Sequence, residues 1–200
     1  YDVGIGPLNT PDGELMSRAV VELAAGVTVR DTDSAAIADG WGRSDTVVAG
    51  DPAIGVQVPS VNAASPDGPV LGVSLRQWDS GVDPEVWNTA LASIVDAHLE
   101  RSGGRAVFID CHRAVRWPLT DDAAAAADVI SKMKFADRAT TVAAETPWQE
   151  RVAVIESCDV VLAMRYHAAL FAMRAGVPTV GLSYDAKVAS LFADWGLPAN

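Results

Sequence analysis

Four cationic side chains in this sequence follow segments with the pattern of β-strands, and together they could bind an anionic ligand. They are Arg30, Arg76, Arg165 and Lys187. Arginine presents a planar fork of N–H donors that matches carboxylate and phosphate groups, and lysine supplies a compact ammonium group. A single arginine at a strand end is more often part of a surface ion pair, so the prediction rests on the four side chains together.

His167 stands two residues after Arg165 and is the candidate for proton transfer. It follows an apolar segment and begins a predicted helix, where the positive end of the helix dipole disfavours imidazolium and keeps the ring neutral near pH 7. A purely structural histidine is the alternative. His112, in a loop after another predicted strand, could also approach a ligand. Further side chains at predicted strand ends are secondary candidates: Ser74, Trp78, Tyr184 and Asp185.

The composition limits the classes of partner. The 200 residues include 15 Lys and Arg against 26 Asp and Glu, for a net charge of −11, so the overall field repels nucleic acid and any anionic substrate needs a local cluster of cations. The two cysteines, Cys111 and Cys158, lack the spacing of a disulfide framework or a zinc site. No metal-ligand cluster is visible elsewhere in the sequence, and we expect no metal and no cofactor. No apolar run approaches the roughly 18 residues of a membrane span, and we expect a cytoplasmic protein.

Strand-like and helix-like segments alternate nearly throughout the chain, which predicts an α/β fold with a parallel sheet. The expected strands are 1–6, 26–30, 46–49, 70–76, 106–110, 140–144, 159–164 and 177–183. The expected helices are 13–25, 31–39, 83–101, one that starts at 120, 147–157, 167–175 and 186–195. In open parallel sheets, ligands bind beyond the carboxyl ends of the strands, where the candidate residues lie.

A segment rich in Pro, Ser, Asn and Gly separates two parts of the chain. The sequence PSVNAASPDGP at 59–69 has no periodicity and is typical of a linker. We expect residues 1–59 to be the C-terminal part of a first domain, residues 60–69 a linker and residues 70–200 a second domain. Because the chain opens at Tyr1 in an apparent strand, we expect the N-terminal half to be incomplete.

Several motifs, taken in order, resemble the polysaccharide pyruvyl transferase family, which transfers a pyruvyl group from phosphoenolpyruvate to a sugar as a ketal. The strongest is CDVVLAMRYHAA at 158–169. The others are VGIGP at 3–7, VRD at 29–31 with Ser34, DPA at 51–53, GVSLR at 72–76 with Trp78, AGVP at 175–178 and SYDAKV at 183–188.

The resemblance implies a glycosyltransferase-B-like fold, with two Rossmann-type parallel sheets, helices on both faces, and the site in the cleft between the halves. It implies that phosphoenolpyruvate is the donor substrate, held by the four cations, and that His167 is the acid or base. The acceptor would be a sugar or a lipid-linked oligosaccharide of an exported glycan, which would allow peripheral association with the inner face of the membrane.

Two other functions remain open at this point. One is a glycosyltransferase of the same fold that uses a sugar nucleotide, although no glutamate for the ribose is evident near residues 183–187. The other is a non-catalytic module that binds an anionic ligand. Phosphate release from phosphoenolpyruvate, turnover of a nucleotide sugar, or tight binding without turnover would discriminate the three.

Overall fold

The computed structural model describes residues 2–58, 68–78, 81–112, 121–183 and 186–197. The chain divides into two compact units, which are described separately. Unit 1 comprises residues 1–56 and 189–199, and unit 2 comprises residues 57–188 and 200. The domain boundaries expected from the sequence stay predictions. Most of the predicted linker and two candidate residues, Tyr184 and Asp185, lie outside the described residues.

Unit 2 is built on a five-stranded parallel sheet with the order β5-β4-β3-β6-β7. Its strands are β3 Val70–Ser74, β4 Arg105–Ile109, β5 Ala139–Val142, β6 Val160–Ala163 and β7 Thr179–Gly181. All five residues of β3 are buried, as expected for a central strand covered on both faces. The chain first builds outward from β3 to β5 and then returns to the other side of β3 with β6, so its direction reverses between β3 and β6.

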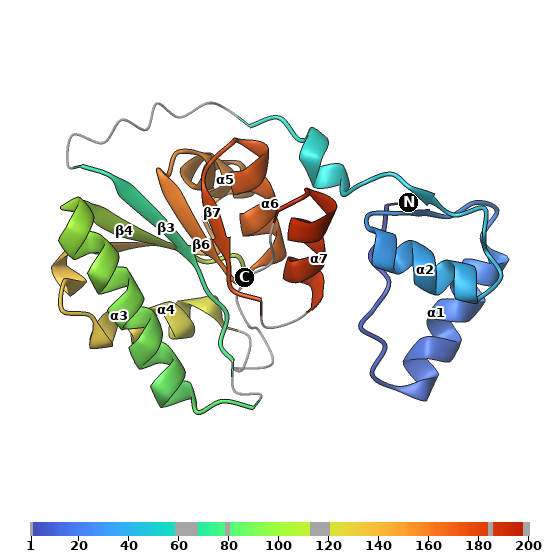
Figure 1. The fold of residues 1–200 in the computed structure, drawn as a ribbon, viewed down its shortest axis with the longest axis horizontal. Coiled ribbons are helices and arrows are strands. Elements are labelled where there is room, and N and C mark those ends of the chain that lie inside the picture. Colours follow the sequence, from blue (N-terminus) through green and yellow to red (C-terminus); the bar gives the residue numbers. More distant parts are fainter. Residues whose placement is uncertain (1, 59–67, 79–80, 113–120, 184–185, 198–200) are drawn as a thin grey trace. The chain divides into compact units, whose positions relative to one another are not determined.

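Helices cover both faces of this sheet (Figure 1). The helices α3 Pro84–Ser102 and α4 Asp122–Lys132 lie on one face, and α5 Trp148–Glu156 and α6 Tyr166–Arg174 lie on the other. A short helix η3 Ala136–Arg138 precedes β5. The helix α7 Ala186–Asp194 follows β7, and its residues from 189 onward belong to unit 1. The core beneath α3 and α4 includes Leu71, Val73, Leu91, Val95, Phe108 and Val129. The predicted α/β class with parallel strands is confirmed.

Polar side chains at the helix ends explain where the helices begin and end. Asp83 and Asp121 cap α3 and α4 by accepting hydrogen bonds from Glu85 and Ala123 N–H groups at 2.9 and 3.1 Å. Gly103 ends α3 with a φ of 69°, a left-handed conformation that glycine adopts at little cost. The N-terminus of α4 lies against the segment after β4, because the Asp122 N–H donates to the His112 carbonyl at 3.2 Å.

Unit 1 contains α1 Pro11–Leu23, β1 Thr28–Val29, α2 Thr32–Gly40, β2 Val47–Val48 and η1 Pro52–Gly55. The strands β1 and β2 pair in parallel. The strand expected at 1–6 is reduced to one bridge between Val3 and Val29. The ladder ends there because the Ile5 N–H donates to the Ser34 hydroxyl at 2.8 Å, and because Pro7 has no N–H.

Gly72, in the centre of β3, allows close packing beneath the sheet. A Cβ atom at this position would lie 2.8 Å from Cys158 Sγ and 3.1 Å from a methyl carbon of Val161. Both contacts are shorter than ordinary van der Waals distances, and Cys158 is itself buried. The glycine of the GVSLR motif therefore has a packing role in the sheet that carries the candidate site.

We predict that Gly72→Ala destabilises the protein by about 1–3 kcal/mol because the added methyl group overpacks the core. The free energy of unfolding in urea measures this cost. Cys158→Ala should relieve most of it in the double variant, and Cys158→Ala alone is the control. An equal cost of Gly72→Ala in both backgrounds would show that the sulfur is not the obstacle.

Candidate active site

The carboxyl ends of β3 and β6 meet where the chain reverses direction across the sheet of unit 2. Ser74, the last residue of β3, lies opposite Ala163 in the register, and the Met164 N–H donates to the Ser74 carbonyl at 2.7 Å. Arg165 follows immediately. In open parallel sheets this reversal point is where ligands bind, so the fold brings two of the predicted residues, Ser74 and Arg165, to the expected position.

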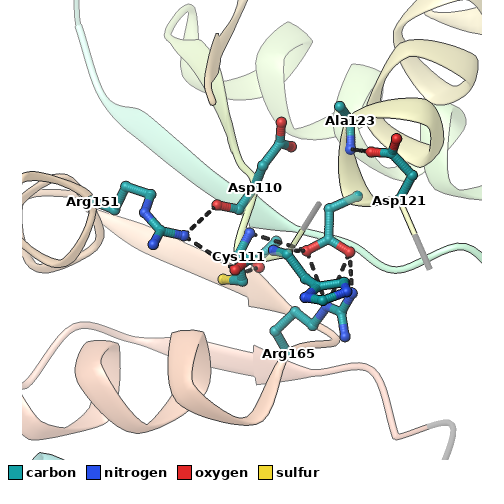
Figure 2. Close-up of polar contacts among 9 residues, drawn as sticks. Asp110, Cys111, Asp121, Ala123, Arg151 and Arg165 are labelled. Atoms are coloured by element: carbon teal, nitrogen blue, oxygen red, sulfur yellow. Dashed lines mark hydrogen bonds and ion pairs between the residues drawn. The ribbon is translucent and has the colours of Figure 1, made fainter. Parts of the chain in front are cut away.

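Asp122 is a buried carboxylate that binds Arg165. Its residue surface is 1% exposed, and both carboxylate oxygens accept from Arg165 Nε at 3.0 and 3.1 Å. Arg165 Nη2 also donates to Oδ1. The N–H groups of Cys111 and His112 donate to Oδ2 at 3.0 and 2.9 Å (Figure 2). A buried ionised carboxylate requires such partners, and here a guanidinium and two backbone donors supply them.

Arg151, on α5, holds the same loop by its carbonyl groups. Its Nη1 donates to the carbonyl oxygens of Asp110 and Cys111 at 2.8 and 3.2 Å, and its Nε donates to the Thr146 carbonyl at 3.0 Å. In Figure 2 the guanidinium reaches the backbone of Asp110, whose carboxyl group points away from it. The loop after β4 is therefore held at its N–H groups by Asp122 and at its carbonyl groups by Arg151.

The side chain of Ser74 contacts the loop after β4. Its hydroxyl lies 3.4 Å from Cys111 Sγ, and Ser74 is 1% exposed. Burial is the main cause that raises the pKa of the Cys111 thiol. A thiol with a raised pKa is a weak nucleophile at neutral pH, so we expect Cys111 to contact Ser74 rather than to react.

His167 occupies the first turn of α6. Arg165 precedes this helix with an extended backbone, φ −84° and ψ 127°, and Tyr166 and His167 begin it. His167 is exposed, its ring meets that of Tyr166 edge-on at 5.3 Å, and the Phe171 ring centre is 6.3 Å away. His167 is therefore exposed near the carboxyl edge of the sheet, two residues after Arg165, and its expected contact with a ligand stays a prediction.

The other two predicted cations of unit 2, Arg76 and Lys187, follow the strands β3 and β7. Arg76 follows β3, and its Cζ atom is 5.9 Å from the centre of the Trp78 ring. Trp78 packs in turn against the core beneath α3 and α4. Lys187 is the second residue of α7 and is half-buried. Their expected contacts with a ligand stay predictions.

Arg30 belongs to unit 1 and is paired there with two carboxylates. Its Nε lies 3.0 Å from Asp31, and its Nη1 lies 3.6 Å from Asp51. Burial raises the pKa of Asp31, but hydrogen bonds from Ser34 and Arg30 outweigh it and leave the pKa below its usual value. A Cβ atom on Gly4 would lie 2.6–2.7 Å from the guanidinium, so a larger residue at this position would displace the Arg30 side chain from its place beside the loop.

Sequence reasoning missed the residues that organise this region: Asp110, Cys111, Asp122 and Arg151. The pair Asp121-Asp122 has the pattern of acidic residues at a helix N-terminus, and Asp121 does act as the cap. The sequence holds no signal that the second aspartate is buried and binds an arginine 43 residues away.

The described residues contain no group of three or more His, Cys, Asp or Glu side chains that could hold a metal ion. The expectation that no metal or cofactor takes part stays a prediction. Within the described ranges, no helix is long and apolar enough to cross a membrane.

The parallel sheet with helices on both faces defines an α/β protein with a glycosyltransferase-B-like fold. Two solved structures share the fold. The crystal structure of TarM matches with a TM-score of 0.52 and 11% identity, over 88% of this chain and 34% of TarM. That of accessory secretory protein 1, 2 and 3 in Streptococcus pneumoniae matches with a TM-score of 0.51 and 8% identity, over 87% of this chain and 34% of the other.

The chain spans about a third of the length of each of these structures, and at such identities the likeness shows the fold alone. The model of the family described as polysaccharide pyruvyl transferase matches residues 3–186. This chain therefore belongs to the polysaccharide pyruvyl transferase family. No curated protein sequence matches it significantly.

Asp110, just beyond β4, is a buried acid whose protonation should affect stability. It is 4% exposed, and burial raises its pKa to about 6, with repulsion from Asp122 and Asp121 adding to the shift. In the unfolded chain the carboxyl group releases its proton near pH 4. The folded protein therefore binds the extra proton between about pH 4 and pH 6.

We predict that stability falls as pH rises through this window, because ionisation of the buried carboxyl group opposes folding above it. Asp110→Asn should stabilise the protein by on the order of 2–3 kcal/mol at pH 7.5 and by little near pH 4. Urea unfolding across this pH range measures the gain. Asp137→Asn changes an exposed carboxylate and should have a small effect at every pH. A gain for Asp110→Asn that is independent of pH would contradict the assignment.

Proposed function

We propose that this protein is a pyruvyl transferase that moves the pyruvyl group of phosphoenolpyruvate onto a sugar of a cell-surface or exported glycan precursor. Membership of the family supports the reaction class. The observation that carries the proposal is the placement of Arg165 and His167 together at the carboxyl end of β6, Arg165 partly buried in an ion pair with Asp122 and His167 exposed.

The proposed donor, phosphoenolpyruvate, is an anion and needs cationic side chains to bind it. Phosphoenolpyruvate carries a phosphate and a carboxylate, which suit bidentate guanidinium groups and a compact ammonium. Arg76, Arg165 and Lys187 follow three strands of one sheet, and Arg30 follows a strand of unit 1. In a chain with a net charge of −11, an anionic substrate needs cations close by, and the three of unit 2 follow strands of the same sheet.

The proposed reaction uses two hydroxyl groups of the acceptor sugar. The first hydroxyl oxygen bonds to C2 of phosphoenolpyruvate while C3 gains a proton and becomes a methyl group. The second hydroxyl oxygen then bonds to C2, the C–O bond to phosphate breaks, and the phosphate leaves with the remaining proton. His167 serves as the acid or base, and the cations stabilise the charge that develops on the departing phosphate.

The acceptor in this proposal is a sugar or a lipid-linked oligosaccharide. The protein acts in the cytoplasm, at the inner face of the membrane where the acceptor is lipid-linked. It needs no metal or other cofactor, because the cations supply the charge stabilisation and His167 moves the proton.

The direct test uses the full-length protein with phosphoenolpyruvate and a panel of glycan precursors. Phosphate release that depends on the acceptor, together with a new methyl singlet of a pyruvyl ketal in the proton NMR spectrum, supports the proposal. Turnover of a nucleotide sugar in place of phosphoenolpyruvate would establish a glycosyltransferase. Tight binding of phosphoenolpyruvate without turnover of any acceptor would establish a binding module.

We predict that His167→Ala lowers kcat by about 10²- to 10⁴-fold, the usual contribution of a general acid or base, while donor affinity changes little. Steady-state kinetics and calorimetric titration with phosphoenolpyruvate separate the two effects. His98→Gln is the matched control, since His98 lies on α3 remote from the carboxyl edge of the sheet. Near-normal kcat in His167→Ala would show that another group transfers the proton.

We predict that Lys187→Ala weakens phosphoenolpyruvate binding by about tenfold, which corresponds to one charge-assisted hydrogen bond of roughly 1.4 kcal/mol. The dissociation constant from titration measures the change. Lys134→Ala removes the same charge from an exposed side chain paired with Glu100 and should leave the affinity unaltered. Equal losses in the two variants would mean that only the overall charge matters.

A further inference from the structure

Asp122 is the most completely buried carboxylate among the described residues, and it joins three segments of unit 2. It is the first residue of α4, it accepts the N–H groups of Cys111 and His112 from the loop after β4, and it binds the guanidinium of Arg165 after β6. The Asp122 N–H also donates to the His112 carbonyl at 3.2 Å. Loop and helix therefore bond to each other in both directions.

The pairing with Arg165 has a consequence for the start of α6. Arg165 is the residue that precedes this helix, and His167 lies two residues further on. Asp122 engages the Nε and Nη2 atoms of the guanidinium, so it restricts rotation of the side chain as well as balancing its charge. An arginine side chain carries about 2 kcal/mol of rotamer entropy, and a side chain that is already ordered loses less of it when a ligand binds.

The two nearby aspartates, Asp110 and Asp121, make different contacts from Asp122. Asp121 accepts the Ala123 N–H at 3.1 Å and caps its own helix. The Asp110 carboxyl group points away from Arg151, and the contact between these residues is made through the Asp110 backbone carbonyl (Figure 2). Asp122 is thus the acid that links the loop after β4 to the cation at the reversal point of the sheet.

We propose that Asp122 is a positioning residue that holds the Arg165 guanidinium, and with it the start of α6, in the orientation needed for pyruvyl transfer. The inference rests on the proposed function. Asp122 acts through Arg165 and does not touch the substrate. Ordering of the Arg165 side chain favours donor binding, whereas the negative charge of Asp122 opposes it. These two effects on donor affinity offset each other, so the main contribution of Asp122 is the orientation of the guanidinium.

The test compares Asp122→Asn with the wild-type full-length protein. The amide keeps the shape of the carboxyl group but loses its charge and one acceptor oxygen. We expect kcat to fall by about 10- to 100-fold, as is usual when a residue that orients a functional group is lost, while the dissociation constant for phosphoenolpyruvate changes less than about threefold. A fall in affinity with kcat unchanged would overturn the proposal.

Arg151→Lys is the matched control for a purely structural role, because Arg151 holds the same loop but binds its carbonyl groups. It should lower the melting temperature as Asp122→Asn does, and kcat should stay within about threefold of wild type. A parallel loss of kcat in both variants would assign the effect to the loop rather than to Arg165.

A double-variant cycle shows whether Asp122 acts through Arg165. In the Arg165→Lys background, Asp122→Asn should cost little further kcat, because the guanidinium that Asp122 orients is already gone. Independent, multiplicative losses would overturn the proposal.

A readout without turnover keeps this inference separate from the proposed function. The Arg165 Nε–H signal in a ¹H–¹⁵N spectrum, identified by its loss in Arg165→Lys, should be protected from solvent exchange in the wild type and lose protection in Asp122→Asn. Protection that survives Asp122→Asn would overturn the positioning role. Absence of phosphoenolpyruvate turnover in the wild type, with protection as expected, would instead refute the proposed function.

Discussion

The need to satisfy a buried charge at Asp122 constrains the carboxyl edge of unit 2. An ionised carboxylate removed from water is tolerated only when opposite charge and hydrogen-bond donors surround it. Here the donors come from the loop after β4 and from Arg165 after β6, and Ser74 on β3 contacts the same loop through Cys111. The loop after β4, the start of α4 and the residues after β6 must therefore pack together, and this packing determines the position of Arg165.

The same principle appears in unit 1, where Arg30 lies against Asp31 and Asp51 beneath the loop at Gly4. In both units an arginine of a family-like motif is held by carboxylates of the same chain. A paired arginine offers less net charge to an anion, but its orientation is already restricted before binding.

Much of the fold could be predicted from local patterns. The apolar runs at β3, β4 and β6 are long and uninterrupted because these strands are covered on both faces, and the alternation with helices indicates parallel connections. The strand predicted at residues 1–6 is longer than the single bridge in the structure. The apolar pattern of these residues does not reveal that the Ile5 N–H donates to a serine hydroxyl 29 residues away. Short segments are governed by such distant partners more than by their own pattern.

The sequence by itself determined the class of fold, the family and the position of Arg165 and His167 at the end of a strand, because these depend on periodicity and on motifs that are contiguous in the chain. The tertiary structure alone decided that Asp122 is buried and binds Arg165, and that Arg151 binds the carbonyl groups of the loop after β4. These hydrogen bonds and ion pairs join residues about 40 positions apart. Their strength depends on how far the assembled sheet and helices exclude water, and no local segment of the sequence encodes that exclusion.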